Sequence, residues 1–141
     1  RISPEKFETH LSDVISMANE IINRFVCDRR IKDASLKASL TNCIRHKSTG
    51  FMLCRHELEE AVKNPIHAGN GRAILLMKSI IELLDGISEV LMVDLAIVSG
   101  FDRISWVVHS SRLIESIDTM LIKGKDRVGL DFAAKVHWSV T

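Results

Sequence analysis

A long apolar stretch between Ala73 and Val98 constrains this chain more than any other feature. Apolar residues recur there at helical spacing and also cover much of the remaining circumference. They are Ile74, Met77, Ile81, Leu84, Leu91, Leu95 and Val98 on the main stripe, with Ile80, Leu83, Ile87, Val90, Met92, Val93 and Ile97 beside it. The sequence therefore predicts a helix from about Arg72 to Ser99 that neighbouring helices, or a partner, must cover.

The same stretch is too charged to be a membrane span. It carries five charged residues, which are Lys78, Glu82, Asp85, Glu89 and Asp94. Each would cost about 2.5–3.5 kcal/mol near the centre of a bilayer. We therefore expect a buried central helix.

A second helix is predicted from Ser3 to the polar run at 28–30. Ser3 can cap the free N–H groups of the first turn, and Pro4 suits the first helical position. Apolar residues then follow at alternating steps of four and three, which is a heptad seam. They are Phe7, Leu11, Val14, Ala18, Ile21 and Phe25.

The segment from Asp33 to Asn64 has two apolar stripes with a polar interruption between them. The interruption is Lys47 to Gly50, and a glycine inside a helix costs about 1 kcal/mol relative to alanine. Whether one helix continues through Gly50, or kinks or breaks there, stays open. The stripes are Leu36, Leu40, Cys43 and Ile44, then Phe51, Cys54, Leu58, Ala61 and Val62.

A further helix is predicted from Phe101 to Ile122, and residues 128–141 could begin a fifth. The apolar stripe of the helix at 101–122 is Phe101, Ile104, Val108, Leu113, Ile117 and Leu121.

Together the predicted helices indicate an all-α fold, an up-and-down four- to five-helix bundle with a long central apolar helix. We expect one domain over residues 1–141, and a fragment of a larger protein because the sequence begins without Met.

Charge and cysteine usage exclude several classes of function. The formal net charge of the 141 residues is only +1, so we expect no nucleic acid partner. Cys43 and Cys54 would lie roughly 16 Å apart if they shared one helix, which is too far for a disulfide. Together with Cys27 they are expected to be the reduced cysteines of a cytoplasmic protein.

No residue spacing supports catalysis, so we expect a non-enzymatic protein without metal or cofactor. Gly69-Asn70-Gly71 lacks the Lys-Ser/Thr pair of a phosphate-binding loop. A zinc site built from Cys43, His46, Cys54 and His56 is the weaker alternative to core cysteines with surface histidines. Likewise, a solvated turn is preferred over a phosphate-binding surface for the basic cluster Arg24, Arg29, Arg30, Lys32 and Lys37.

Residues 33–98 resemble the N-terminal region of the vinculin and α-catenin family. Leu36-Lys37 through Asn64-Pro65 is similar to the family's helix that ends at an Asp/Asn-Pro turn. After a loop with Arg72-Ala73, the run Leu83-Leu84-x-x-Ile87-x-x-Val90-Leu91, followed by Asp94 and Val98, is similar to its LLxxVxxLLxxxAD pattern.

This resemblance implies an adhesion or cytoskeletal adaptor in the cytoplasm, at cell junctions or adhesion sites. Its bundle would bind a partner helix, β-catenin-like or talin-like, or form a homodimer. The expected partner-binding residues are Leu36, Leu40, Ile44, Leu84, Ile87 and Leu91. Two alternatives stay open: a homodimerisation module of another regulatory or ribonucleoprotein assembly, and an apolar helix covered entirely within one monomer.

Overall fold

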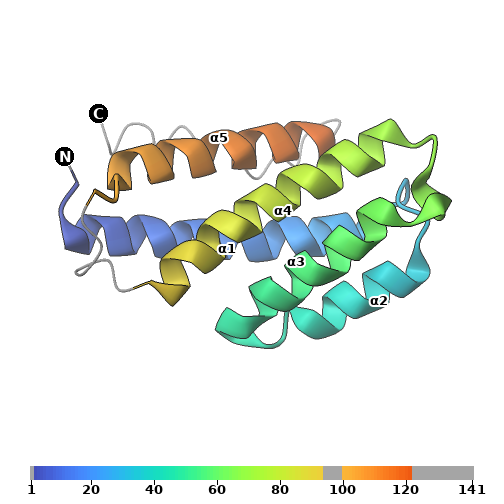
Figure 1. The fold of residues 1–141 in the computed structure, drawn as a ribbon, viewed down its shortest axis with the longest axis horizontal. Coiled ribbons are helices and arrows are strands. Elements are labelled where there is room, and N and C mark those ends of the chain that lie inside the picture. Colours follow the sequence, from blue (N-terminus) through green and yellow to red (C-terminus); the bar gives the residue numbers. More distant parts are fainter. Residues whose placement is uncertain (1, 94–99, 122–141) are drawn as a thin grey trace.

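The computed structural model describes residues 2–93 and 100–121, and these residues form helices and no β-strand (Figure 1). The all-α class is therefore confirmed. None of the helices in this described part combines the length and the apolar character that crossing a membrane requires. The helices are α1 Pro4–Cys27, α2 Ala34–Cys43, α3 Lys47–Lys63, the short 3-10 helix η1 Pro65–His67, α4 Gly71–Met92 and α5 Arg103–Leu121.

Successive α-helices lie side by side and reverse direction from one to the next (Figure 1). Helix α4 packs against α3, α5 and α1, and α5 returns to pack against α1. Helix α2 packs against α1 and α3, and in the described part of the chain α1 and α3 scarcely touch each other. Helix α2 therefore fills the space between α1 and α3 at the edge of the molecule.

Helix α1 forms as its sequence predicts. The Ser3 side chain accepts a hydrogen bond from the backbone N–H of Lys6 at 3.2 Å, and Pro4 is the first helical residue. All six residues of the predicted seam are buried, and His10 and Ile22 are buried beside them. The seam faces the core because it is the one continuous apolar stripe on this helix.

The segment 33–64 is two antiparallel helices rather than one. Helix α2 ends at Cys43, the chain turns over residues 44–46, and α3 runs back along α2 (Figure 1). Gly50 lies in the first turn of α3, where an added Cβ would be 2.5 Å from the carbonyl oxygen of Cys43. The break therefore comes before Gly50, and the glycine permits the close approach of the two backbones.

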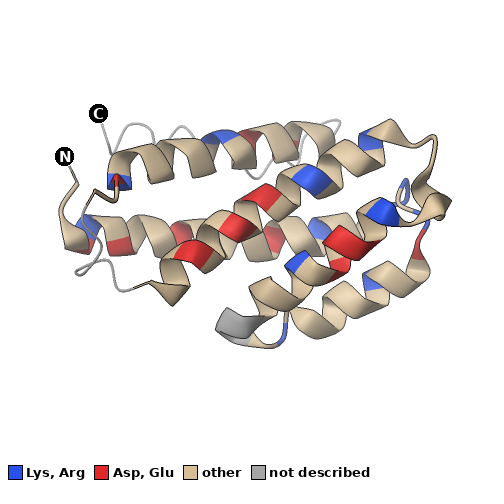
Figure 2. Ribbon diagram, in the orientation of Figure 1, with Lys and Arg blue, Asp and Glu red and all other residues tan. Residues whose placement is uncertain are grey.

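Helix α4 is shorter and less enclosed than predicted. Val93 has extended backbone angles, φ −118° and ψ 135°, so the helix ends at Met92 and not near Ser99. Leu91 and Met92 are already 39% and 69% exposed, so another turn there would gain little buried area. The predicted core residues Leu95, Ile97 and Val98 lie outside the described residues. The outward face is charged, with Lys78, Glu82, Asp85 and Glu89 exposed (Figure 2).

Helix α5 begins and faces the core differently from the prediction. It starts at Arg103, after Asp102, whose carboxylate accepts a hydrogen bond from the N–H of Ser105 at 3.0 Å. Its buried face is Val107, Ser110, Ser111, Ile114, Ile117 and Asp118. Of the predicted stripe only Ile117 is fully buried. The prediction missed the buried face because three of its residues are polar and were not counted as core positions. The predicted helix at 128–141 falls outside the described residues.

Candidate functional site

The six predicted partner-binding residues do not form an open surface. Leu36, Leu40, Leu84 and Ile87 are at most 5% exposed and belong to one hydrophobic cluster. Ile44 packs at the margin of that cluster, and Leu91 is 39% exposed at the end of α4. A partner helix can therefore contact the four buried residues only after one of the helices has moved.

Helix α2 is the helix whose movement would cost least. It has ten residues and buries only Leu36 and Leu40, whereas α4 buries nine side chains. Full burial of a leucine stabilises a fold by about 1.5–3 kcal/mol. The two leucines therefore hold α2 in place with a modest free energy, shared between its contacts with α1 and α3.

Polar contacts attach the beginning of α2. Asp33 accepts a hydrogen bond from the backbone N–H of Leu36 at 3.0 Å, and its second carboxylate oxygen lies 3.0 Å from Nε2 of His67. The Lys37 ammonium donates to the carbonyl oxygen of Asp28 at 2.8 Å. His67 is 4% exposed, although the sequence indicated only a loop there. The cap at Asp33 was predictable, whereas its contact with η1 was not, because the two residues are 34 positions apart.

Two thiols meet at the end of α2. The Cys54 thiol donates to the carbonyl oxygen of Leu40 at 4.0 Å and lies close enough to the Cys43 thiol to interact with it. Burial raises the pKa of Cys54 to about 12 and also raises the pKa of Cys43. The separation of roughly 16 Å was predicted for two cysteines on one helix, and this condition is not met, because the chain reverses between them.

Polar contacts join α4 to α3 and to α5. The Arg55 guanidinium contacts Asp85 at 2.9 Å and Glu59 at 3.3 Å. His109 is exposed and lies 2.9 Å from the carboxylate of Glu82. No acid was apparent at helical spacing from His109, and its partner indeed comes from another helix. These exposed pairs contribute little stability each, but they help to fix how α3, α4 and α5 align.

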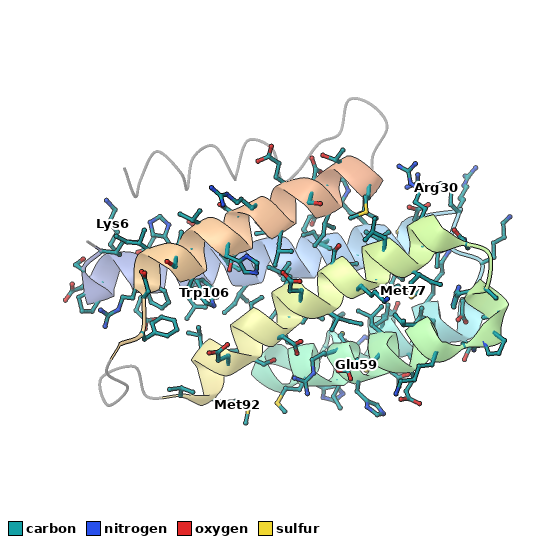
Figure 3. The ribbon with its side chains drawn as sticks, turned by 45° about the horizontal axis from the view of Figure 1, so that its top comes forward. Lys6, Arg30, Glu59, Met77, Met92 and Trp106 are labelled. Carbon is teal, nitrogen blue, oxygen red and sulfur yellow. The ribbon has the colours of Figure 1, made fainter. Side chains whose placement is uncertain are left out.

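The basic cluster around residues 24–37 is largely engaged within the protein. Arg24 pairs with Asp118 at 3.7 Å, and Arg30 pairs with Asp28 at 2.7 Å. The Arg30 guanidinium, which is labelled in Figure 3, also donates to the carbonyl oxygens of Met120 and Leu121 at the end of α5. Charges of both signs are mixed over the surface of the helices (Figure 2). The arrangement favours the solvated turn over a phosphate-binding surface.

The cysteines and histidines are placed as core and surface residues. Cys54 is buried, Cys43 is half-buried, and His46 and His56 are exposed. Within residues 2–93 and 100–121, no three His, Cys, Asp or Glu side chains converge closely enough to hold a metal ion. The two thiols are therefore a pair without further metal-ligating neighbours in that part of the chain.

Comparisons of the chain with protein-family models, with curated proteins and with solved structures find no match. A function therefore has to be proposed from the geometry of α2 and α4 and from the sequence resemblance at residues 33–98. Both concern the same part of the molecule, since α2, α3 and α4 lie within those residues.

Proposed function

We propose that this chain is a non-enzymatic interaction module that accepts a partner helix in the position of α2. In this proposal the helices are an up-and-down bundle with α4 as the long central apolar helix. The observation that supports it is the weak attachment of α2, which fills the space between α1 and α3 with two buried leucines. Outward movement of α2 would uncover the apolar residues of α1 and α3 beneath it.

The free energy of exchange favours a longer partner helix. An amphipathic helix that places four or five Leu or Ile side chains in the same space gains about 1.5–3 kcal/mol for each. Helix α2 supplies two such side chains. The surplus can offset the cost of association, as it does when helices bind in apolar grooves of other proteins.

The sequence resemblance gives this module a cellular role. Vinculins and α-catenins use helical bundles to link adhesion proteins to the cytoskeleton. We propose that this chain is a divergent adaptor of that kind, cytoplasmic and recruited to junctions or adhesion sites. Its partner would then present a β-catenin-like or talin-like helix.

Leu91 provides the test of this proposal. It belongs to the predicted partner-binding residues, and in this proposal a partner helix longer than α2 extends as far as Leu91 at the end of α4. Leu91 is 39% exposed, so a glutamate fits there without burial of its charge. We expect Leu91→Glu to weaken binding of fluorescently labelled β-catenin or talin helices about threefold or more, since a partner can bury only the exposed part of Leu91, worth roughly 0.6–1.2 kcal/mol. Leu84→Glu is unsuitable, because Leu84 is fully buried and the fold would be disrupted.

Leu75→Glu is the matched control. Leu75 lies on the same helix, is 57% exposed and is outside the proposed face. The control should bind as the unchanged chain does, and both variants should unfold at similar urea concentrations. Equal affinities of the two variants, or no binding of either labelled helix by the unchanged chain, contradict the proposed site.

Self-association is the second candidate, and exposed apolar side chains favour it. Met52 and Leu53 near the start of α3 and Leu91 and Met92 at the end of α4 are 37–69% exposed. Both segments lie at one end of the molecule, where Met92 points outward (Figure 3). Such a module would serve a regulatory or ribonucleoprotein assembly as a homodimer. Light scattering should then show a dimer that Met92→Glu dissociates, whereas a monomer at high concentration excludes this candidate.

A further inference from the structure

Reversal of the chain between α2 and α3 brings together two cysteines that are eleven positions apart. Cys43 is the last residue of α2, and Cys54 lies on the second turn of α3. The Cys54 thiol donates to the carbonyl oxygen of Leu40 at 4.0 Å, one helical turn before Cys43, and it interacts with the Cys43 thiol. The two thiols therefore lie close together at the interface between the helices.

The backbone around this pair is closely fitted. The Cα of Gly50 approaches the carbonyl group of Cys43 so closely that no side chain fits between them. Cys43 packs at the margin of the core cluster that contains Cys54. The end of α2 and the start of α3 are thus held together. A disulfide here requires both cysteine side chains to rotate until the sulfurs are about 2.05 Å apart.

We propose that Cys43 and Cys54 are an oxidisable dithiol site that reacts with a low-molecular-weight disulfide and cross-links α2 to α3. The Cys43 thiolate attacks oxidised glutathione, a sulfur–sulfur bond forms between them, and one glutathione leaves as a thiolate that takes up a proton. Cys54 then loses its proton and attacks the Cys43 sulfur, which releases the second glutathione. Two protein thiols are oxidised, and one glutathione disulfide is reduced to two thiols.

Exposure assigns the order of these steps. Cys43 is half-buried and within reach of a small oxidant, whereas Cys54 is 0% exposed and can react only with its neighbour. Burial raises the pKa of both thiols, so little thiolate is present at neutral pH. Since the thiolate is the attacking species, the reaction accelerates as pH rises. Cys27 at the end of α1 is exposed and has to be removed from the experiment.

The test uses the full chain with Cys27→Ser, folded and incubated with oxidised glutathione at pH 7 and pH 9. We expect loss of two hydrogen atoms from the intact mass, faster at pH 9. Trypsin cleaves after Lys37, Arg45, Lys47 and Arg55, so digestion without a reductant should yield peptide 38–45 joined to peptide 48–55. Dithiothreitol should separate the two peptides.

The matched control adds Cys54→Ser to the same chain. Without its second thiol, Cys43 should retain one glutathionyl group, which shows that Cys43 reacts with oxidised glutathione. The proposal is overturned if that group also persists on the chain with both cysteines. It is equally overturned if both thiols stay free at pH 9, or if the cross-link forms only in urea. No partner is present, so these outcomes are independent of the proposed helix binding.

Discussion

Gly50 decides how closely the ends of α2 and α3 can approach. A Cβ at this position would lie 2.5 Å from the carbonyl oxygen of Cys43, which is a backbone atom that cannot move away easily. Helix propensity alone would make Gly50→Ala stabilising by about 1 kcal/mol. We expect the opposite, a loss of about 1–3 kcal/mol in the free energy of unfolding, because overpacking outweighs propensity. Urea denaturation measures this difference.

Gly86 is the control for the Gly50 experiment. It lies within α4, where an added Cβ would be 3.5 Å from the Trp106 side chain, an ordinary contact. Trp106 donates its hydrogen bond to the Gly86 carbonyl oxygen, and alanine keeps that group. Gly86→Ala should therefore stabilise the fold by about 0.5–1 kcal/mol. A Gly50→Ala variant that gains as much stability would contradict the close approach.

His10 makes the stability of the fold depend on pH. It is 5% exposed, and among the described residues neither ring nitrogen has a hydrogen-bond partner. Burial lowers its pKa, nearby Asp13 raises it in part, and Lys6 lowers it further. The unfolded chain therefore binds the proton more readily than the folded one. The free energy of unfolding is accordingly not reduced by His10 above about pH 6.5, and it falls as pH drops below that value.

The pH dependence should weaken when His10 is replaced. We expect His10→Leu to reduce the fall in the free energy of unfolding between pH 7 and pH 5, where one such group contributes at most about 1.4 kcal/mol per pH unit. His56→Gln, at an exposed position, should leave the fall unchanged. Denaturant titrations at a series of pH values measure both. An identical pH profile for His10→Leu would show that His10 is not held neutral by burial.

At the scale of the helices, local sequence patterns predicted where most helices lie, whereas the positions of the helix ends were less predictable. The capping Ser3, Pro4 and the heptad seam all lie within α1, so the sequence predicted this helix and its buried face. The start of α4 at Gly71 is close to the predicted Arg72, and there the Asn70 side chain accepts a hydrogen bond from the N–H of Ala73. The end of α4 depends on which neighbours cover its last turn, and this information is not local.

The arrangement of α2 and α3 depended on contacts that no local pattern contains. The polar interruption at 47–50 permitted a kink, a break or a reversal, and the contact between Gly50 and Cys43 selects the reversal. The pairs Asp33–His67 and Cys43–Cys54 follow from that reversal and were not predicted. The face of α5 was misassigned because its core side includes serines and a buried aspartate.

The candidate site was predictable as a set of apolar residues but not as a surface. Helical spacing identified Leu36, Leu40, Leu84 and Ile87, and the structure buries all four in one cluster. Spacing could not show that Leu91 lies 39% exposed at the end of its helix. Exposure depends on where the neighbouring helices end, and that is set by the packing of the whole chain.

For the whole molecule, we propose that the helices form a core with one replaceable edge. Helix α4 buries nine side chains among three neighbouring helices, whereas α2 buries two between α1 and α3. Sub-global opening of a protein begins in elements with few buried apolar contacts. In the free chain, α2 should accordingly exchange its amide hydrogens with solvent sooner than α4.

Hydrogen exchange of the complex, read by mass spectrometry, tests the replacement of α2 most directly. The chain would be compared alone and saturated with a β-catenin or talin helix that it binds. If the partner takes the position of α2, amides at residues 34–43 should lose protection on binding, while those of α1 and α3 keep or gain it. Retained or increased protection of α2 in the complex would contradict the account.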